Sequence, residues 1–303
     1  MSTGVNKGLN TATVNAVADK VGESMWSKAA YKFRRDRTGM LGLYVVVIYM
    51  LVALGVALGF WGTEWSDNNG QKWEGITSQY WFGTNILGQD IFERAIFSTK
   101  TAFEVGLVVA VISTLIGAVL GALSGFFSNS WIDEIILWMM GVLDSIPFYL
   151  FVAAIAFALS GFAYAMHVAM IVTFWTTTAR LVRGEVIKLK NFEFVEAARA
   201  VGVPQHIIIF RHILPNTFHI LLVQSTIVFV GAIKSEVILS FLGLGVKDGV
   251  SWGLMIAEST LEVQAGEFAN FYAASIFLFI LVMAFNMFSD ALQDALDPRK
   301  VSA

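Results

Sequence analysis

The residues best suited to chemistry in this sequence are a few ionisable side chains that lie within long apolar runs. Lys234 and Glu236 lie in one run, and Asp144 lies in another, close to Pro147. A charge is costly in lipid, so each is expected to face a pathway or a partner, or to snorkel toward the surface. Lys234 and Glu236 are two residues apart and diverge on a helix, so they do not pair. We interpret Lys234, Glu236 and Asp144 as candidate pathway residues.

Motifs for covalent catalysis and for metal binding are absent from the sequence. It has no cysteine, and its histidines lack the spacing of metal ligands. It has no His-Glu-x-x-His, no Gly-x-Ser-x-Gly and no paired intramembrane aspartates. The segment Gly231–Ser235 superficially resembles a phosphate loop, but it lacks two of the required glycines and lies in an apolar run. The sequence therefore predicts no catalytic residue, no metal site and no cofactor held by this chain.

A polar loop between two apolar runs carries the most informative pattern. Helix-forming residues fill 193–200, Gly202 suits the left-handed position after a helix end, and Pro204 prevents continuation. This pattern predicts a short capped helix in water, whose small face could seat in a groove on another protein or lie on lipid head groups. Spacing alone leaves both interpretations open. The candidate contact residues are Phe192, Phe194, Glu196, Ala197, Ala198, Arg199, Gly202 and Pro204.

The composition indicates that lipid surrounds the elements that position these residues. Of 303 residues, 56% are apolar and 14% are charged, whereas soluble domains have roughly 45–50% apolar and about 25% charged residues. About 20 apolar residues are needed to cross the hydrocarbon as a helix. Six stretches are long enough, at about 41–61, 102–127, 134–159, 161–182, 217–241 and 271–292.

Lysine and arginine residues indicate how these six spans are oriented. They gather before the first span, in the 180–211 loop and in the tail at Arg299 and Lys300. With six spans, all three segments lie on one face, and the positive-inside rule makes that face cytoplasmic. Both termini are then cytoplasmic in an inner, cytoplasmic membrane. The net charge of −3 gives no reason to expect nucleic acid as a partner.

Three local patterns predict further features of the spans and of the segments between them. Gly117, Gly121 and Gly125 give the second span a bare face, which predicts close helix packing, or alternatively a moving interface. The amphipathic segment 85–101 predicts a separate interfacial helix along the outer surface. Pro147 should kink the third span.

Several motifs, taken in order, resemble ABC-importer permeases of the dipeptide and oligopeptide branch. Glu196-Ala197-Ala198, then Gly202 and Leu214-Pro215, resembles the EAA loop of that family, although His212 stands where an apolar residue is usual. Further matches are the basic Phe33–Arg37 stretch, Phe82-Gly83-Thr84-Asn85 with Gly88-Gln89-Asp90, Ser240–Gly245 with Ser251-Trp252-Gly253, and Asp290–Arg299. Asn85 and Gln89 replace an acid and an arginine, so an ion pair expected there is missing. Lys234 is also unexpected, and it bears on the cargo rather than on the class.

The resemblance implies the fold and the partners. It implies an all-α membrane protein of the type I ABC importer permease kind, with six transmembrane helices and a cytoplasmic coupling-helix loop. The chain is similar to the C-type subunit, which would pair with a sister permease, two ATPase subunits that bind ATP and Mg²⁺, and an extracytoplasmic binding protein. The coupling helix would dock in a cleft on an ATPase. Membrane lipid is the remaining partner.

The expected function is a pathway for short peptides, with no covalent chemistry in this chain. Relatives of this branch also carry nickel chelates, glycosides and peptide-like antibiotics, so these cargoes remain alternatives. An ion-coupled secondary carrier is a further alternative, but such folds show repeated broken helices. The expected organisation is a cytoplasmic N-terminal segment with a basic amphipathic stretch (1–40), a first span (41–61), an outer loop with an interfacial helix (62–101), a core of five spans with coupling loop 183–216 (102–292) and a cytoplasmic tail (293–303).

Overall fold

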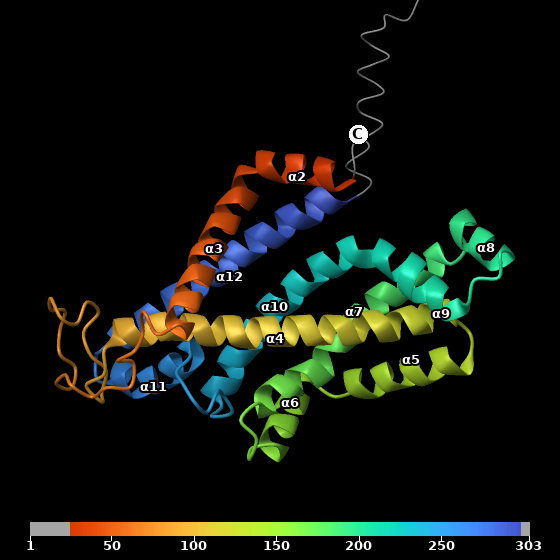
Figure 1. Cartoon of the computed structure of the whole chain (residues 1–303). Helices are drawn as coiled ribbons and strands as arrows, with labels where there is room; N and C mark the ends of the chain where they lie inside the picture. The colour runs from red at the N-terminus through yellow and green to blue at the C-terminus, as the bar shows by residue number, and fades with distance from the viewer. Residues whose placement is uncertain (1–24, 298–303) are drawn as a thin grey trace, which may run out of the picture.

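The computed structural model describes residues 25–297, and the chain within them is helical (Figure 1). The expected segments 1–40 and 293–303 therefore lie partly outside the described residues. Pairing of extended backbone within this range is limited to one isolated antiparallel bridge between Thr84 and Asp90. The first helices are α2 (Met25–Arg35), α3 (Arg37–Ala57), α4 (Ile91–Phe126), α5 (Trp131–Asp144), α6 (Phe148–Ala158) and α7 (Ala165–Leu189). They are followed by α8 (Glu193–Ala200), α9 (Gln205–Ile207), a π-helical turn (Ile208–Ile213), a 3₁₀ turn (Leu214–Thr217), α10 (Phe218–Phe241), α11 (Trp252–Gln264) and α12 (Ala269–Leu296).

Four helical runs are long and apolar enough to cross a membrane. They are Arg37–Ala57, Ile91–Phe126, Gln205–Phe241 and Ala269–Leu296. The pair α5 and α6 makes a fifth if it is counted as one broken span. The expectation of an all-α protein is confirmed, whereas the count of six also needs α7, a 25-residue helix. Threonines, a histidine and basic residues make α7 less apolar than the four runs.

The expected separate interfacial helix over 85–101 is wrong. Asp90 caps the start of α4 by accepting from the backbone N–H of Phe92 at 2.8 Å, and from there the helix continues unbroken for 36 residues. Ile91 and Ala95 are buried in the protein. The polar residues of this stretch contact other segments of the chain, as Arg94 does with Glu258. Their spacing therefore does not mark a boundary between water and lipid. The boundary expected at 101–102 therefore falls inside one helix.

The kink expected at Pro147 is a full break between two helices. α5 ends at Asp144, α6 begins at Phe148 after Pro147, and the two helices are bent by 91°. Proline lacks a backbone N–H and clashes with the preceding turn, which explains where the helix breaks. The expected fourth span begins later than predicted, at Ala165.

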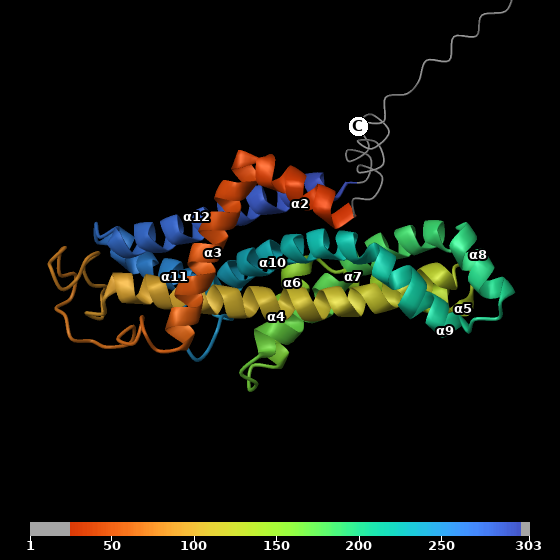
Figure 2. The same ribbon diagram turned by 45° about the horizontal axis from the view of Figure 1, so that its top comes forward.

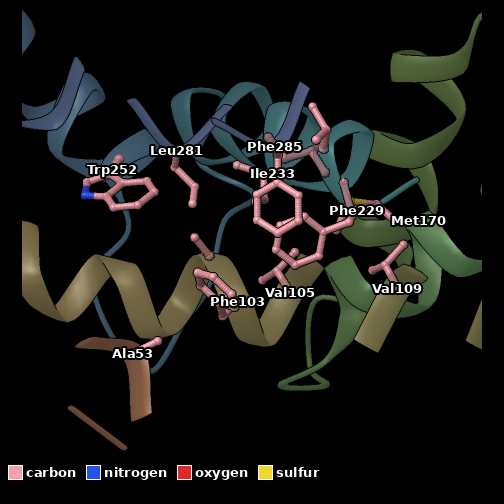
Figure 3. Close-up of a cluster of buried hydrophobic side chains, with 14 of the residues drawn as sticks. Ala53, Phe103, Val105, Val109, Met170, Phe229, Ile233, Trp252, Leu281 and Phe285 are labelled. Atoms are coloured by element: carbon pink, nitrogen blue, oxygen red, sulfur yellow. The ribbon is translucent and has the colours of Figure 1, made fainter. Parts of the chain in front are cut away.

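The long helix α4 is the axis of the bundle, with α11 and the loop between α3 and α4 at one end and α8 and α9 at the other (Figures 1 and 2). α7 packs against its C-terminal half through small residues, and α10 packs against its N-terminal half, where Phe229 covers Gly106. Aromatic rings fill the centre: Phe229 and Phe285 stack with centroids 4.1 Å apart, and Phe103 meets Phe229 edge-on at 5.5 Å (Figure 3). These ring contacts join α4 to α10 and α12 at the centre of the bundle.

Candidate functional site

The polar loop after α7 forms the helix that its sequence predicts. α8 begins after Phe192, whose backbone is extended. It ends in a Schellman motif, in which the N–H of Val203 donates to the carbonyl of Ala198 and the N–H of Gly202 donates to the carbonyl of Arg199, both at 3.0 Å. Gly202 has φ of +82°, the left-handed region that favours glycine. The helix is therefore closed at its C-terminal end by backbone bonds that its own sequence specifies.

The outward side of α8 is open and carries large apolar side chains beside charged ones. Phe192, Phe194 and Val201 are exposed, and Val201 is 84% exposed. The rings of Phe192 and Phe194 meet edge-on with centroids 6.1 Å apart. A Cβ added to Gly202 would meet nothing within 4 Å. Large exposed apolar side chains on a helix surrounded by polar loop mark a contact surface for a partner.

The inward side of α8 is anchored in the bundle. Val195 is fully buried in a cluster with side chains of α4 and α7 and of the helical turn after α9. The guanidinium of Arg199 lies over the ring of Phe126, 5.3 Å from its centroid. The remaining predicted contact residues, Glu196, Ala197 and Pro204, are exposed, and Ala198 is half-buried. A displacement of α8 would therefore act directly on the side chains of α4 and α7 that pack against it.

The two ionisable side chains predicted on α10 have opposite environments. Lys234 is exposed. Glu236 is only 3% exposed, and its Oε1 accepts from the hydroxyl of Ser240. Ser240 in turn lies 3.3 Å from the hydroxyl of Ser251 at the start of α11. Of the pair, Lys234 is exposed, whereas Glu236 is buried within its own chain.

Asp144 lies at the break between α5 and α6, next to a hollow of about 460 Å³. Its carboxylate pairs with Arg180 and accepts from the hydroxyl of Thr176 at 3.2 Å. The hollow is also lined by Pro147 and by the hydroxyl-bearing Thr173. Sequence reasoning placed Arg180 in the basic loop and missed this contact, because α7 continues to Leu189.

The three small residues predicted on the second span all face α7. Each of these three glycines lies so close to α7 that an added Cβ would collide with it. The nearest atoms would be the Thr178 Cβ at 2.6 Å for Gly117, the Ala179 carbonyl oxygen at 2.5 Å for Gly121 and the Arg183 carbonyl oxygen at 2.7 Å for Gly125. Such spacing lets two backbones meet directly.

A polar network at the opposite end of α4 was missed from the sequence. Arg94 is buried and donates to Gln89 and to Glu258 of α11. Burial raises the pKa of Glu258, and the charge of Arg94 opposes this rise. Asn85 donates to Gln89 at 2.9 Å, so a neutral amide pair stands where the resemblance implies an ion pair.

Within residues 25–297, no three His, Asp or Glu side chains lie close enough together to hold a metal ion.

Comparison with known proteins agrees with this arrangement. Residues 117–302 match the family model described as binding-protein-dependent transport system inner membrane component. The oligopeptide transport system permease protein OppC of Bacillus subtilis is 34% identical over 91% of this chain and 90% of its own length. The dipeptide transport system permease protein DppC of the same organism is 32% identical, covering 88% and 84%. The glutathione transport system permease protein GsiD of Pectobacterium atrosepticum is 31% identical, covering 95% and 96%.

The family model covers more than half of the chain, and the relatives extend over nearly all of it. These matches confirm the resemblance that the EAA loop suggested, and the apolar helices agree with a multi-pass membrane protein. This chain belongs to the family of inner membrane components of binding-protein-dependent transport systems, the permeases of ABC importers.

Proposed function

We propose that this chain is one of two membrane-spanning subunits of an ATP-driven importer and that its cargo is short peptides. The observation that carries the proposal is α8, a helix anchored by Val195 with exposed apolar side chains at Phe192, Phe194 and Val201. The names of the oligopeptide and dipeptide permeases among its relatives support a peptide cargo. The name of the glutathione permease favours a second candidate, a glutathione-like cargo.

In this proposal α8 docks into a cleft on an ATPase subunit, which binds ATP and Mg²⁺. Phe192, Phe194 and Val201 bury their apolar surface there, and this burial supplies the binding free energy. Gly202 lets the partner approach the end of the helix. A sister permease completes the pathway, and an extracytoplasmic binding protein delivers cargo at the opposite end. Purifying the tagged chain from its native membrane tests this assembly: two ATPases and a second permease should be recovered with it, and recovery of the chain alone would refute it.

The chain crosses the membrane six times in this proposal. The crossings are α3, α4, the broken pair α5–α6, α7, the helical run through α10, and α12. This order puts α2, α8 and the end of α12 on the cytoplasmic side, and the loop between α3 and α4 outside together with α11. The separation of α8 and α11 to opposite ends of α4 supports this orientation (Figure 1).

Single cysteines test the orientation, since the natural chain has none. Val201 and Ile76 are 84% and 80% exposed, so a cysteine at either site can react. In intact cells an impermeant thiol reagent should label Ile76→Cys and leave Val201→Cys unlabelled. Both should react after permeabilisation of cells that make this chain without its ATPase subunits, so that docking does not cover Val201→Cys. Labelling of Val201→Cys from outside would invert the proposed topology.

Lys234 and Asp144 are the proposed pathway residues, since each is an ionisable side chain at an accessible position in a span. We expect Lys234→Met to change the relative uptake of acidic and basic peptides while the complex still assembles. Lys234→Arg keeps the charge and should resemble the natural chain. The measurement is competition between acidic, neutral and basic peptides in reconstituted vesicles. An unchanged order of preference in Lys234→Met would remove this residue from the pathway.

A further inference from the structure

An ion pair joins the turn between α4 and α5 to the helix that leads into α8. Arg183 of α7 donates from Nε and Nη2 to the two carboxylate oxygens of Asp133, both at 2.9 Å. Asp133 is 2% exposed, and it also accepts from the Ser124 hydroxyl and from the backbone N–H of Asn129. Every lone-pair direction of this carboxylate is used. A two-point guanidinium–carboxylate contact fixes distance and angle together, which a lysine cannot do.

Two more cations of the same segment contact the same turn. Lys190, just after α7, donates to the Ser128 hydroxyl and lies 3.5 Å from the Phe126 carbonyl oxygen. Arg199, within α8, covers the ring of Phe126. An ion pair, a hydrogen bond and a cation–π contact thus connect the α7–α8 segment to the end of α4 and the start of α5. Three contacts of different kinds over one turn resist both sliding and rotation.

The other end of α5 is attached to the same helix. Asp144, its last residue, pairs with Arg180 of α7, one turn from Arg183. Pro147 and the 91° bend follow immediately. Between the two ends, Met140 is buried against α7. α5 is therefore attached to α7 at both ends, and its far end meets the broken part of the span.

We infer that the α4–α5 turn (residues 126–133) is the element through which α8 moves the broken helix pair, and that Asp133 and Arg183 are its positioning residues. The inference rests on the proposed docking of α8 to an ATPase and names how its displacement travels. A buried ion pair adds little net stability relative to an apolar pair, but it selects one geometry. Together with the contact between Arg199 and Phe126, this pair holds α8, α5 and the inner end of α7 as one body. A displacement of α8 is then transmitted to the bend at Pro147.

The geometric consequence can be measured with two spin labels. Glu193→Cys at the start of α8 and Trp131→Cys at the start of α5 are both exposed sites, and neither residue belongs to the proposed docking surface. In the assembled transporter, the distance between the labels should stay the same with and without a non-hydrolysable ATP analogue. With Arg183→Gln added, the distribution should broaden and become dependent on nucleotide. A nucleotide-dependent distance in the chain with Arg183 intact, or no change on adding Arg183→Gln, would overturn the inference.

Transport supplies the functional arm. Arg183→Gln and Lys190→Met should each lower peptide uptake and the stimulation of ATP hydrolysis by loaded binding protein, by roughly 5-fold to 150-fold, the usual range of coupling between sites. Lys190 is only half-buried, so Lys190→Met should still fold and assemble. It therefore tests the inference even if Arg183→Gln does not assemble. Lys188→Met is the matched control: Lys188 lies two residues away and pairs only locally with Glu185. It should be silent.

The outcomes separate this inference from the proposed function. If Gly202→Val abolishes stimulated hydrolysis while Arg183→Gln and Lys190→Met behave as the natural chain, α8 docks as proposed and the role of the turn is refuted. If all three are normal, the docking role of α8 fails as well. Loss in the two turn variants with a silent Lys188→Met supports the inference.

Discussion

Replacing Gly202 by valine should abolish coupling while leaving the membrane bundle intact. Gly202 has φ of +82° at the end of α8, and a β-branched residue in that region costs about 1–3 kcal/mol. Because a Cβ there would meet nothing within 4 Å, the damage is confined to the end of α8 and to the partner's approach. In the reconstituted complex, peptide uptake and stimulated ATP hydrolysis should fall at least about tenfold, the equivalent of about 1.4 kcal/mol.

A second substitution separates the two causes. Asparagine tolerates the left-handed region far better than valine. Gly202→Asn should therefore restore the helix end, and it should restore uptake if backbone strain is the main cause. If steric exclusion of the partner dominates, Gly202→Asn should be as inactive as Gly202→Val, and ATPase subunits should be lost on purification. Normal uptake by Gly202→Val would mean that the loop is only a connector.

Replacing Gly121 by valine should destabilise the whole bundle. An added Cβ would lie 2.5 Å from the Ala179 carbonyl oxygen and 3.0 Å from its Cα, and these backbone atoms cannot move unless α4 and α7 separate. Overpacking of this kind costs about 1–3 kcal/mol or more. The expected result is a lower midpoint of thermal unfolding in detergent and a reduced yield of the assembled complex.

A matched control uses a glycine that has room. Gly184 lies in α7, and a Cβ there would meet no atom within 4 Å. Gly184→Ala should unfold at the same temperature as the natural chain or slightly above, since alanine favours a helix over glycine. If Gly121→Val unfolds at the same temperature as Gly184→Ala, the direct backbone contact between α4 and α7 does not hold the bundle together.

Much of the fold and of the contact helix follows from local pattern. The long apolar stretches predicted a helical membrane protein, because each needs only its own hydrogen bonds to cross lipid. The C-terminal end of α8 was predictable, since Gly202 and Pro204 act on the backbone of their own neighbours. The small residues of α4 also predicted a close helix contact. They did not identify α7 as the packing partner, because a run of small residues is compatible with any helix that can approach closely.

Other features depend on residues that are far apart in the chain. Arg183 lies fifty positions after Asp133, and Arg94 is paired with a glutamate of α11, so neither buried contact leaves a local pattern. Arg94 belongs to the stretch expected as an interfacial helix, because amphipathicity looks the same whether the polar side meets water or buried partners. For the same reason Glu236 and Lys234, two positions apart, could not be assigned to the inside and the outside of the chain.

The sequence by itself thus determined the helical membrane class, the family likeness and the capped helix, since composition, spacing and turn chemistry act over a few residues. Only the tertiary structure decided that α4 runs unbroken from Ile91, that α5 and α6 bend by 91° at Pro147, and that the α4–α5 turn is joined to α8. A proline predicts where a helix ends, but it does not predict the direction of the helix that follows. That direction is set by packing against α7, which brings together side chains from distant parts of the chain.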